Sequence, residues 1–162
     1  SVFGQSVILL LIQIGGLGVV TIAVSIAMLS GRKISLMQRS TMQDAISAPK
    51  VGGIVRLTRF ILKGTFGIEL LGALFLLPVF LRDYGGKGIW MALFHSVSAF
   101  CNAGFDLIGV REPFSSLTSY ASNPLVNFTI MALIVTGGVG FVTWQISKKI
   151  NYILKSIICR VK

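Results

Sequence analysis

The 162-residue chain is 54% hydrophobic and only 12% charged, with a mean hydropathy of +0.84. These values lie far from those of an average soluble domain and indicate an integral membrane protein. A net charge of +10 would otherwise suggest nucleic-acid binding. Because so apolar a chain has no long soluble basic surface, we expect no nucleic-acid partner.

The basic residues are concentrated in two parts of the chain. Residues 31–63 hold seven Lys and Arg against one acid, and residues 148–162 hold five with no acid, whereas residues 82–124 hold three bases and three acids. Loops rich in Lys and Arg stay on the cytoplasmic side of a membrane. The pattern therefore predicts a multi-pass protein of the cell membrane with 31–58 and 147–162 in the cytoplasm and 82–124 outside.

Residues 1–30 are almost uninterruptedly apolar, and about 20 such residues suffice to cross a bilayer. We predict a transmembrane helix there. Its glycines Gly15, Gly16 and Gly18 are interpreted as a packing surface, because small residues let helices approach closely in lipid. The basic linker 31–58 contains Pro and Gly breakers and is predicted to lie along the inner headgroups of the lipid.

A second crossing is predicted over residues 59–81, with Pro78 bending its outer end. Glu69 is the single acid in this span, where a charge costs about 2.5–3.5 kcal/mol on insertion scales. Two interpretations of Glu69 stay open. It is either a structural carboxyl, hydrogen-bonded to a neighbouring helix, or a group with a role in gating or in an ion path.

Residues 89–98 are apolar and long enough for about three helical turns, yet too short for a full crossing. This length favours a re-entrant pore helix that leads into the segment 101–106. Non-helical backbone at membrane depth is tolerated where it is buried in protein or lines a water-filled cavity. The segment after the helix is therefore predicted to line such a cavity.

That segment is predicted to be an ion-selectivity filter. The carboxyl end of a helix attracts cations, and backbone carbonyls can replace part of the hydration shell of an ion. The predicted ligands are the carbonyl oxygens of Asn102, Ala103, Gly104 and Phe105, with Gly104 supplying conformational freedom and Asp106 lying at the outer mouth. His95, the only histidine, is predicted to be packed and hydrogen-bonded behind the filter.

The last crossing is predicted over residues 124–146, opened by Pro124 at a position where a helix accepts proline. Residues 147–162 are expected to form a basic amphipathic segment at the inner surface. The chain starts at Ser1, without an initiator methionine, and enters an apolar run at once. We therefore expect it to be a fragment or excerpt of a longer protein.

An internal repeat is visible at an offset of 122 residues, where Leu11–Thr21 matches Leu133–Thr143. Repeated units of this kind indicate a repeat architecture. The unit consists of a helix, a re-entrant helix with its filter, and a second helix. The chain is then predicted to hold the last helix of one repeat and a complete second repeat, and four repeats would surround one pore.

Three runs resemble the membrane subunit of the bacterial Trk/Ktr potassium-uptake systems, closest to the Ktr branch: Gly4–Thr21, Phe94–Leu107 and Gly137–Trp144. The resemblance implies an all-α pore built by further repeats of the same polypeptide, located in the bacterial inner membrane. It also implies a homodimer and a cytoplasmic nucleotide-binding regulatory subunit. Gly104 matches the filter glycine of that family, while Cys101 stands where many members carry a polar residue such as asparagine.

The predicted function is potassium transport through a carbonyl-lined filter. Potassium is then the transported ion, sodium is a candidate co-ion, and no other metal or bound cofactor is expected. The chain is not expected to be an enzyme, because no nucleophile with a base, paired carboxylates or metal ligands converge in the sequence. The alternative is a secondary carrier with a substrate site at broken, glycine-rich helices.

Overall fold

The computed structural model describes residues 1–18, 26, 54–110 and 115–139 of the chain. This part is helical throughout its regular structure and contains no β-strand, as the predicted all-α class requires. Its elements are α1 (Val2–Leu17), α4 (Ile54–Tyr84), α5 (Lys87–Phe100), the 3-10 helices η2 (Ile108–Val110) and η3 (Ser116–Tyr120), and α6 (Pro124–Val139).

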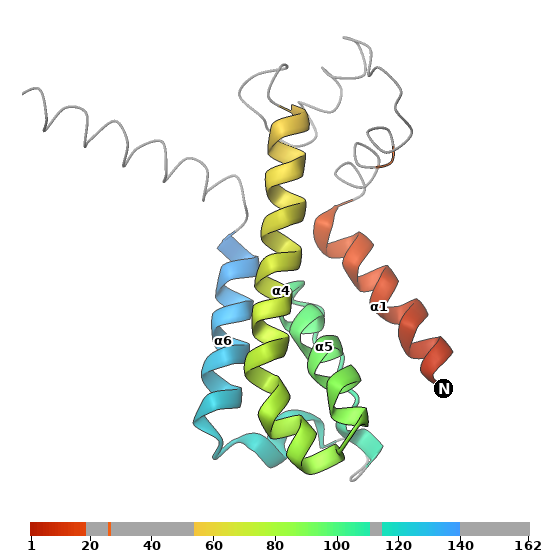
Figure 1. Ribbon diagram of the computed structural model, residues 1–162, viewed down its shortest axis with the longest axis vertical. Helices are drawn as coiled ribbons and strands as arrows, with labels where there is room; N and C mark the ends of the chain where they lie inside the picture. Colours follow the sequence, from red (N-terminus) through yellow and green to blue (C-terminus); the bar gives the residue numbers. More distant parts are fainter. Residues whose placement is uncertain (19–25, 27–53, 111–114, 140–162) are drawn as a thin grey trace, which may run out of the picture.

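The longest helix, α4, runs through the middle of the described part, with α6 on one side and α5 and α1 on the other (Figure 1). Helix α5 rises from the lower end of α4 only to about the middle of that helix (Figure 1). The chain then returns to the lower end, where α6 begins. Helix α5 packs against α4, α6 and α1 and is the element that the others surround.

The burial of α5 explains why a 14-residue helix is stable here. Most residues of α5 are apolar and need to be enclosed, and nearly all residues from Met91 to Phe100 are buried, including the hydrogen-bonded His95, Ser96 and Ser98. Phe94 and Val97 pack against Ile12 of α1, and Phe100 packs against Leu133 of α6. The carboxyl end of α5 is therefore held on several sides.

The lower end of the molecule has its own apolar core. Leu76 and Phe80 of α4, Met91 of α5 and Val126 of α6 form it with Ile108 and Tyr120 of the connecting segment. The hydroxyl of Tyr120 donates to Oδ2 of Asp83 at 2.8 Å, and burial raises the pKa of Tyr120 above its ordinary value. This bond ties the connection between α5 and α6 to the end of α4.

The outward surfaces of the long helices are apolar. Large exposed side chains include Phe66, Leu70 and Phe75 of α4 and Phe128 and Val135 of α6. Contiguous apolar surface of this kind is covered by lipid or by other protein, because water disfavours it. Of the described helices, α4 alone is long and apolar enough to cross a membrane, over Thr58–Tyr84, while α1 and α6 are shorter apolar helices.

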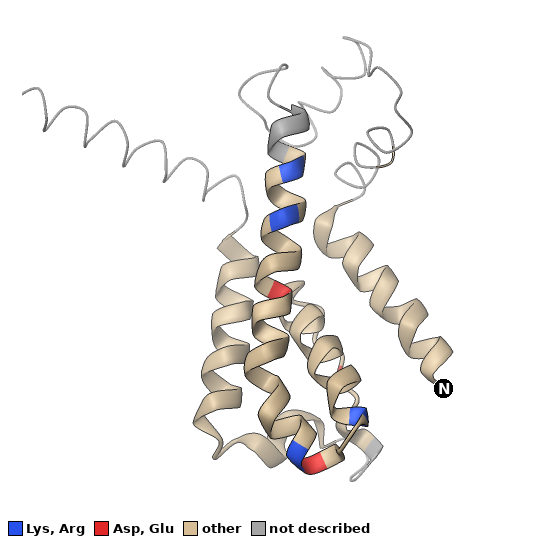
Figure 2. Cartoon of the chain, viewed as in Figure 1, with Lys and Arg blue, Asp and Glu red and all other residues tan. Residues whose placement is uncertain are grey.

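The described charges are unevenly distributed along α4. Arg59 and Lys63 lie in its first third, and Figure 2 shows no acid at that end among the described residues. Arg82 and Asp83 lie at the opposite end and carry opposite charges, and Lys87 follows as the first residue of α5. The basic segment 31–63 and the segment 82–124, which has equal numbers of bases and acids, therefore include opposite ends of α4.

The observed helix boundaries differ from the expected ones at several points. The predicted helix over 1–30 is not continuous, because α1 ends at Leu17 and Gly18 has φ 77°, a conformation that glycine adopts without steric cost. The linker predicted to reach residue 58 ends earlier, since α4 begins at Ile54 and continues through Pro78 to Tyr84. The short helix is Lys87–Phe100 rather than 89–98.

The start of the last helix agrees with the sequence. Helix α6 begins at Pro124, and Oδ1 of Asn123 accepts hydrogen bonds from the N–H groups of Leu125 and Val126 at 3.1 and 3.3 Å. Asparagine is a favoured N-cap for this reason. The expected remainder of this helix, 140–146, lies outside the described residues, as do the linker 31–53 and the segment 147–162.

Candidate functional site

The candidate site is the segment that follows α5, residues 101–106, which we call the filter segment. Helix α5 ends in a Schellman motif, in which the N–H of Asn102 donates to the carbonyl of Ala99 at 3.1 Å and that of Ala103 to the carbonyl of Ser98 at 2.9 Å. Asn102 adopts φ 54°, the left-handed conformation that this motif requires. Asparagine tolerates that conformation better than most side chains do.

Gly104 is the second left-handed residue of the filter segment, with φ 73°. The backbone at this position thus has a conformation that favours glycine, as the sequence predicts. Apart from its own chain neighbours, no described residue would lie within 4 Å of a Cβ atom added there, so conformation rather than space is the constraint. Two left-handed residues separated by Ala103 make this stretch neither helix nor strand.

Ser98 connects α5 to both ends of this turn. Its carbonyl accepts the N–H of Ala103, and its hydroxyl donates to the carbonyl oxygen of Phe105 at 2.6 Å. The carbonyl of Phe105 thus points one lone pair at α5. The carbonyls of Asn102, Ala103 and Gly104 accept no hydrogen bond from the described residues, so these three oxygens are free for another partner.

His95 fixes the chain just beyond the filter segment. Its Nδ1 lies 2.7 Å from the carbonyl oxygen of Met91, and its Nε2 lies 3.3 Å from the N–H of Leu107. A carbonyl only accepts and an amide N–H only donates, so the neutral ring with its proton on Nδ1 satisfies both. The side chain is 2% exposed, and the prediction of a packed, hydrogen-bonded histidine is confirmed.

Asp106 lies at the end of the filter segment and is half-buried. Its Oδ1 accepts the N–H of Ile108 at 3.0 Å, which stabilises the turn into η2. A cavity of about 250 Å³ lies beside it, between the filter segment, α5, η3 and α6. The residues that line this cavity include His95, Ser98, Asn102, Gly104, Phe105, Asp106, Ser116 and Ile134.

Glu69 is 3% exposed and lies next to the start of the filter segment. Its Oε2 accepts a hydrogen bond from Nε2 of Gln13 on α1 at 3.1 Å, and its Oε1 lies 3.9 Å from the Sγ of Cys101. The interpretation of Glu69 as a carboxyl bonded to a neighbouring helix agrees with these contacts. Its proximity to Cys101 places it behind the filter segment.

Close approach of helices at glycines holds this region together. A Cβ at Gly16 of α1 would collide with the side chain of Cys101, and a Cβ at Gly137 of α6 would collide with the carbonyl oxygen of Phe100. Gly15 and Gly18 have no such neighbours within the described part of the chain. One glycine of each repeated motif therefore packs against the end of α5, and Gly140 lies outside the described residues.

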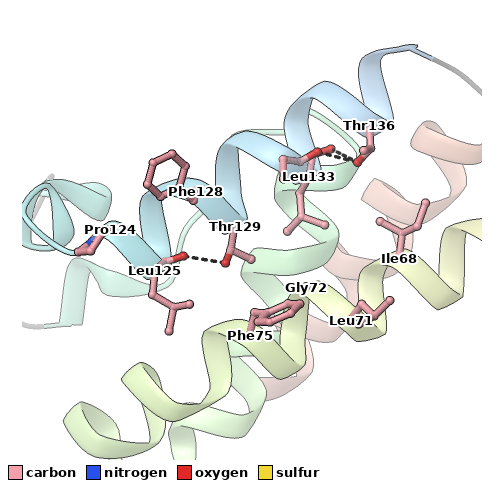
Figure 3. A pocket seen from close by; sticks show the side chains of 11 residues that line it. Ile68, Leu71, Gly72, Phe75, Pro124, Leu125, Phe128, Thr129, Leu133 and Thr136 are labelled. Atoms are coloured by element: carbon pink, nitrogen blue, oxygen red, sulfur yellow. Dashed lines mark hydrogen bonds between the residues drawn. The ribbon is translucent and has the colours of Figure 1, made fainter.

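A larger groove lies between α4 and α6 and is apolar (Figure 3). Its volume is about 620 Å³, and Phe75, Leu125 and Phe128 are among its lining residues. The hydroxyls of Thr129 and Thr136 donate to carbonyls of their own helix, at 2.7 Å in each case. Apart from these two hydroxyls, the described side chains that line the groove carry no oxygen, so the groove is almost wholly apolar.

Sequence reasoning missed two residues of the site. Ser98 and Gln13 carry no motif, and their partners, Phe105 and Glu69, lie 7 and 56 positions away in the chain. Gln13 did leave a signal, because it is a strongly polar residue in an apolar helix and Glu69 is another. Pairing the two would have predicted the contact between α1 and α4.

Comparison with known proteins gives consistent matches over most of the chain. A family model described as "TrkH: Cation transport protein" matches residues 1–157. The chain is 44% identical over 142 residues to Ktr system potassium uptake protein B of Bacillus subtilis (strain 168), covering 87% of this chain and 31% of that protein. It is 39% identical over 143 residues to potassium/sodium uptake protein NtpJ of Enterococcus hirae, covering 88% and 31% respectively.

A third relative is Ktr system potassium uptake protein B of Vibrio alginolyticus, 34% identical over 139 residues, covering 85% of this chain and 30% of that protein. The chain thus spans about a third of the length of these relatives. The extent of the family match and the identity to named uptake proteins show that the chain belongs to the TrkH family of cation transport proteins, whose members are membrane transporters and not enzymes.

Proposed function

We propose that this chain supplies one selectivity filter of a potassium-conducting pore, with the carbonyl oxygens of Asn102, Ala103 and Gly104 as its main ligands. The observation that carries the proposal is a turn with two left-handed residues and three carbonyls that accept no hydrogen bond from the described residues. Carbonyl oxygens that replace ion hydration are what a potassium filter needs. Phe105 contributes less, since Ser98 already donates to its carbonyl.

The position of the turn supports the same proposal. It follows the carboxyl end of a buried helix, where the helix dipole places partial negative charge. Apolar side chains of α1, α4 and α6 surround α5, and an apolar environment strengthens that electrostatic attraction. Asp106, beside the turn, adds a formal negative charge that attracts cations to the outer mouth.

One filter segment supplies too few ligands to dehydrate an ion, so the pore requires other copies of the unit. The match between Leu11–Thr21 and Leu133–Thr143 supports a repeated unit, and further repeats of the same polypeptide would complete the ring. The names of the relatives speak of a Ktr system. We propose that the full-length protein forms a homodimer in the inner membrane. A nucleotide-binding regulatory subunit would bind to this homodimer from the cytoplasm. Sodium is the candidate co-ion, as the name of the Enterococcus hirae relative suggests.

The full-length protein should restore growth at limiting potassium to a bacterial strain that lacks its own potassium-uptake systems, and should take up rubidium. Rubidium serves as a potassium tracer because its size and charge are similar. An organic substrate that competes with rubidium would favour the secondary carrier instead. Full-length protein that is present in the membrane but takes up no rubidium would contradict the proposal.

We also propose that the Arg59 end of α4 faces the cytoplasm and the Asp83 end faces outside. In a variant without native cysteines, Ser116→Cys in η3 should react with an impermeant thiol reagent added to whole cells, whereas Ser35→Cys should not. The positive-inside rule gives this expectation, since Ser35 lies within the basic segment 31–63. The reverse labelling pattern would invert the topology.

A further inference from the structure

Three helices meet at Glu69, just behind the filter segment. Its Oε2 accepts from Nε2 of Gln13 on α1 at 3.1 Å, and its Oε1 lies 3.9 Å from the thiol of Cys101. Its backbone carbonyl accepts the hydroxyl of Ser96 on α5 at 2.6 Å. This single residue of α4 therefore contacts the helix of the preceding repeat, the middle of α5 and the first residue of the filter segment.

The packing around Glu69 leaves little room for these contacts to shift. One turn further along α4, a Cβ at Gly72 would lie 2.5 Å from Oγ of Ser96 and 2.7 Å from a methyl carbon of Leu133. A Cβ at Gly16 would collide with Cys101 from the other side. Because close-packed interiors relax only partly, a change at the carboxyl is transmitted to its neighbours.

The chemistry of the contacts assigns each group a role. The amide of Gln13 and the thiol of Cys101 both donate, and the two carboxyl oxygens of Glu69 each accept one of them. Among the described residues Glu69 forms no ion pair. The carboxyl therefore serves as a bridge between two neutral donors, one on α1 and one at the start of the filter segment.

We propose that Glu69 is a positioning residue of the filter. Held by Gln13, it fixes Cys101, the C-cap of α5, and Cys101 in turn fixes the direction of the Asn102 carbonyl. Cys101 directly precedes Asn102, which has φ 54°, so a small backbone rotation at Cys101 would change the direction of the Asn102 carbonyl. In this way α1, the last helix of the first repeat, influences the ion selectivity of the filter segment in the second repeat. The proposal rests on the filter assigned above.

The test compares two side-chain hydrogen bonds of α1 in the full-length protein. Gln13→Leu removes the bond to Glu69, and Gln5→Leu removes the bond that Nε1 of Trp90 donates to Oε1 of Gln5 at 2.9 Å, at the other end of α1. The readout is inhibition of rubidium uptake by sodium, normalised to folded protein. Gln13→Leu should change the ratio of the sodium and rubidium half-saturation concentrations about fivefold, or about 1 kcal/mol, and Gln5→Leu should leave it unchanged.

Two variants of Glu69 separate hydrogen bonding from simple packing. Glu69→Leu should shift the ratio as Gln13→Leu does, whereas Glu69→Gln should keep the wild-type ratio. In Glu69→Gln the amide oxygen still accepts from Cys101, and the amide NH₂ donates to the Oε1 of a flipped Gln13. Should Glu69→Leu fail to fold, Cys101→Ala is expected to give the same shift. An unchanged ratio in Gln13→Leu, or an equal shift in Gln5→Leu, would overturn the positioning role.

The same measurement distinguishes this proposal from the function on which it rests. If Gly104→Ser alters the sodium-to-rubidium ratio and Gln13→Leu does not, the filter stands and the role of Glu69 falls. If neither variant alters the ratio, residues 101–106 are not the filter, and both proposals fall together.

Discussion

In the full-length protein, Gly104→Ser is expected to lower the preference for potassium over sodium about tenfold, which corresponds to about 1.4 kcal/mol. Gly104 has φ 73°, and a residue with a side chain pays about 1–2 kcal/mol in the left-handed region. In the described part of the chain only its own neighbours lie within 4 Å of a Cβ built there, so the serine meets no steric clash with those residues. The backbone relieves its strain by rotating, and that rotation misaligns the carbonyl ligands.

Gly85→Ser is the matched control for this variant. Gly85 also has a positive φ, 59°, and a Cβ there would meet none of the described residues within 4 Å, but it lies in the turn between α4 and α5. Gly85→Ser should lose about as much folding stability as Gly104→Ser. Sodium should inhibit its rubidium uptake as strongly as it inhibits that of the wild type. Equal selectivity in Gly104→Ser and the wild type, with rubidium uptake retained, would remove Gly104 from the filter.

Gly137→Ala is expected to destabilise the folded protein by about 1–3 kcal/mol relative to Gly138→Ala, the range that overpacking of a close-packed site costs. A Cβ at Gly137 would overlap the carbonyl oxygen of Phe100, which is backbone and cannot rotate away. A Cβ at Gly138 would lie 3.9 Å from Nδ2 of Asn102, an ordinary contact. Both changes gain the same helix propensity, so the difference isolates the contact with α5.

Thermal unfolding of the two variants in detergent measures this difference. The midpoint for Gly137→Ala should fall well below that for Gly138→Ala, and rubidium uptake should fall with the amount of folded protein. If Gly137→Ala were as stable as Gly138→Ala but had lost uptake, the glycines would have a role in the ion path rather than in packing.

Sequence patterns anticipated the elements that depend on local chemistry. The length of the apolar run at 89–98 indicated a short helix, and Pro124 indicated where α6 begins. Gly104 was singled out because free carbonyls favour a residue without a side chain, and its φ of 73° agrees with that reasoning. Each of these inferences used a constraint that acts within a few residues.

Contacts between residues far apart in the chain could not be predicted from local sequence patterns. The bond from Ser98 to the carbonyl of Phe105 requires the chain to fold back on α5, which no spacing in the sequence states. The contact between α1 and α4 joins Gln13 to Glu69, two residues that are 56 positions apart in the chain. The end of α1 at Gly18 was missed because small residues suit both close packing and chain breaks, and hydropathy does not separate the two.

The central claim is that a dehydrated cation binds to the carbonyl oxygens of residues 102–104. The most direct test is a crystal structure of the full-length protein in rubidium, with anomalous scattering used to locate the ion. We expect an anomalous peak on the axis of the pore, within coordination distance of the carbonyls of Asn102, Ala103 or Gly104, and absent after exchange into sodium. A rubidium peak located elsewhere in the membrane region, with none beside these carbonyls, would contradict the account.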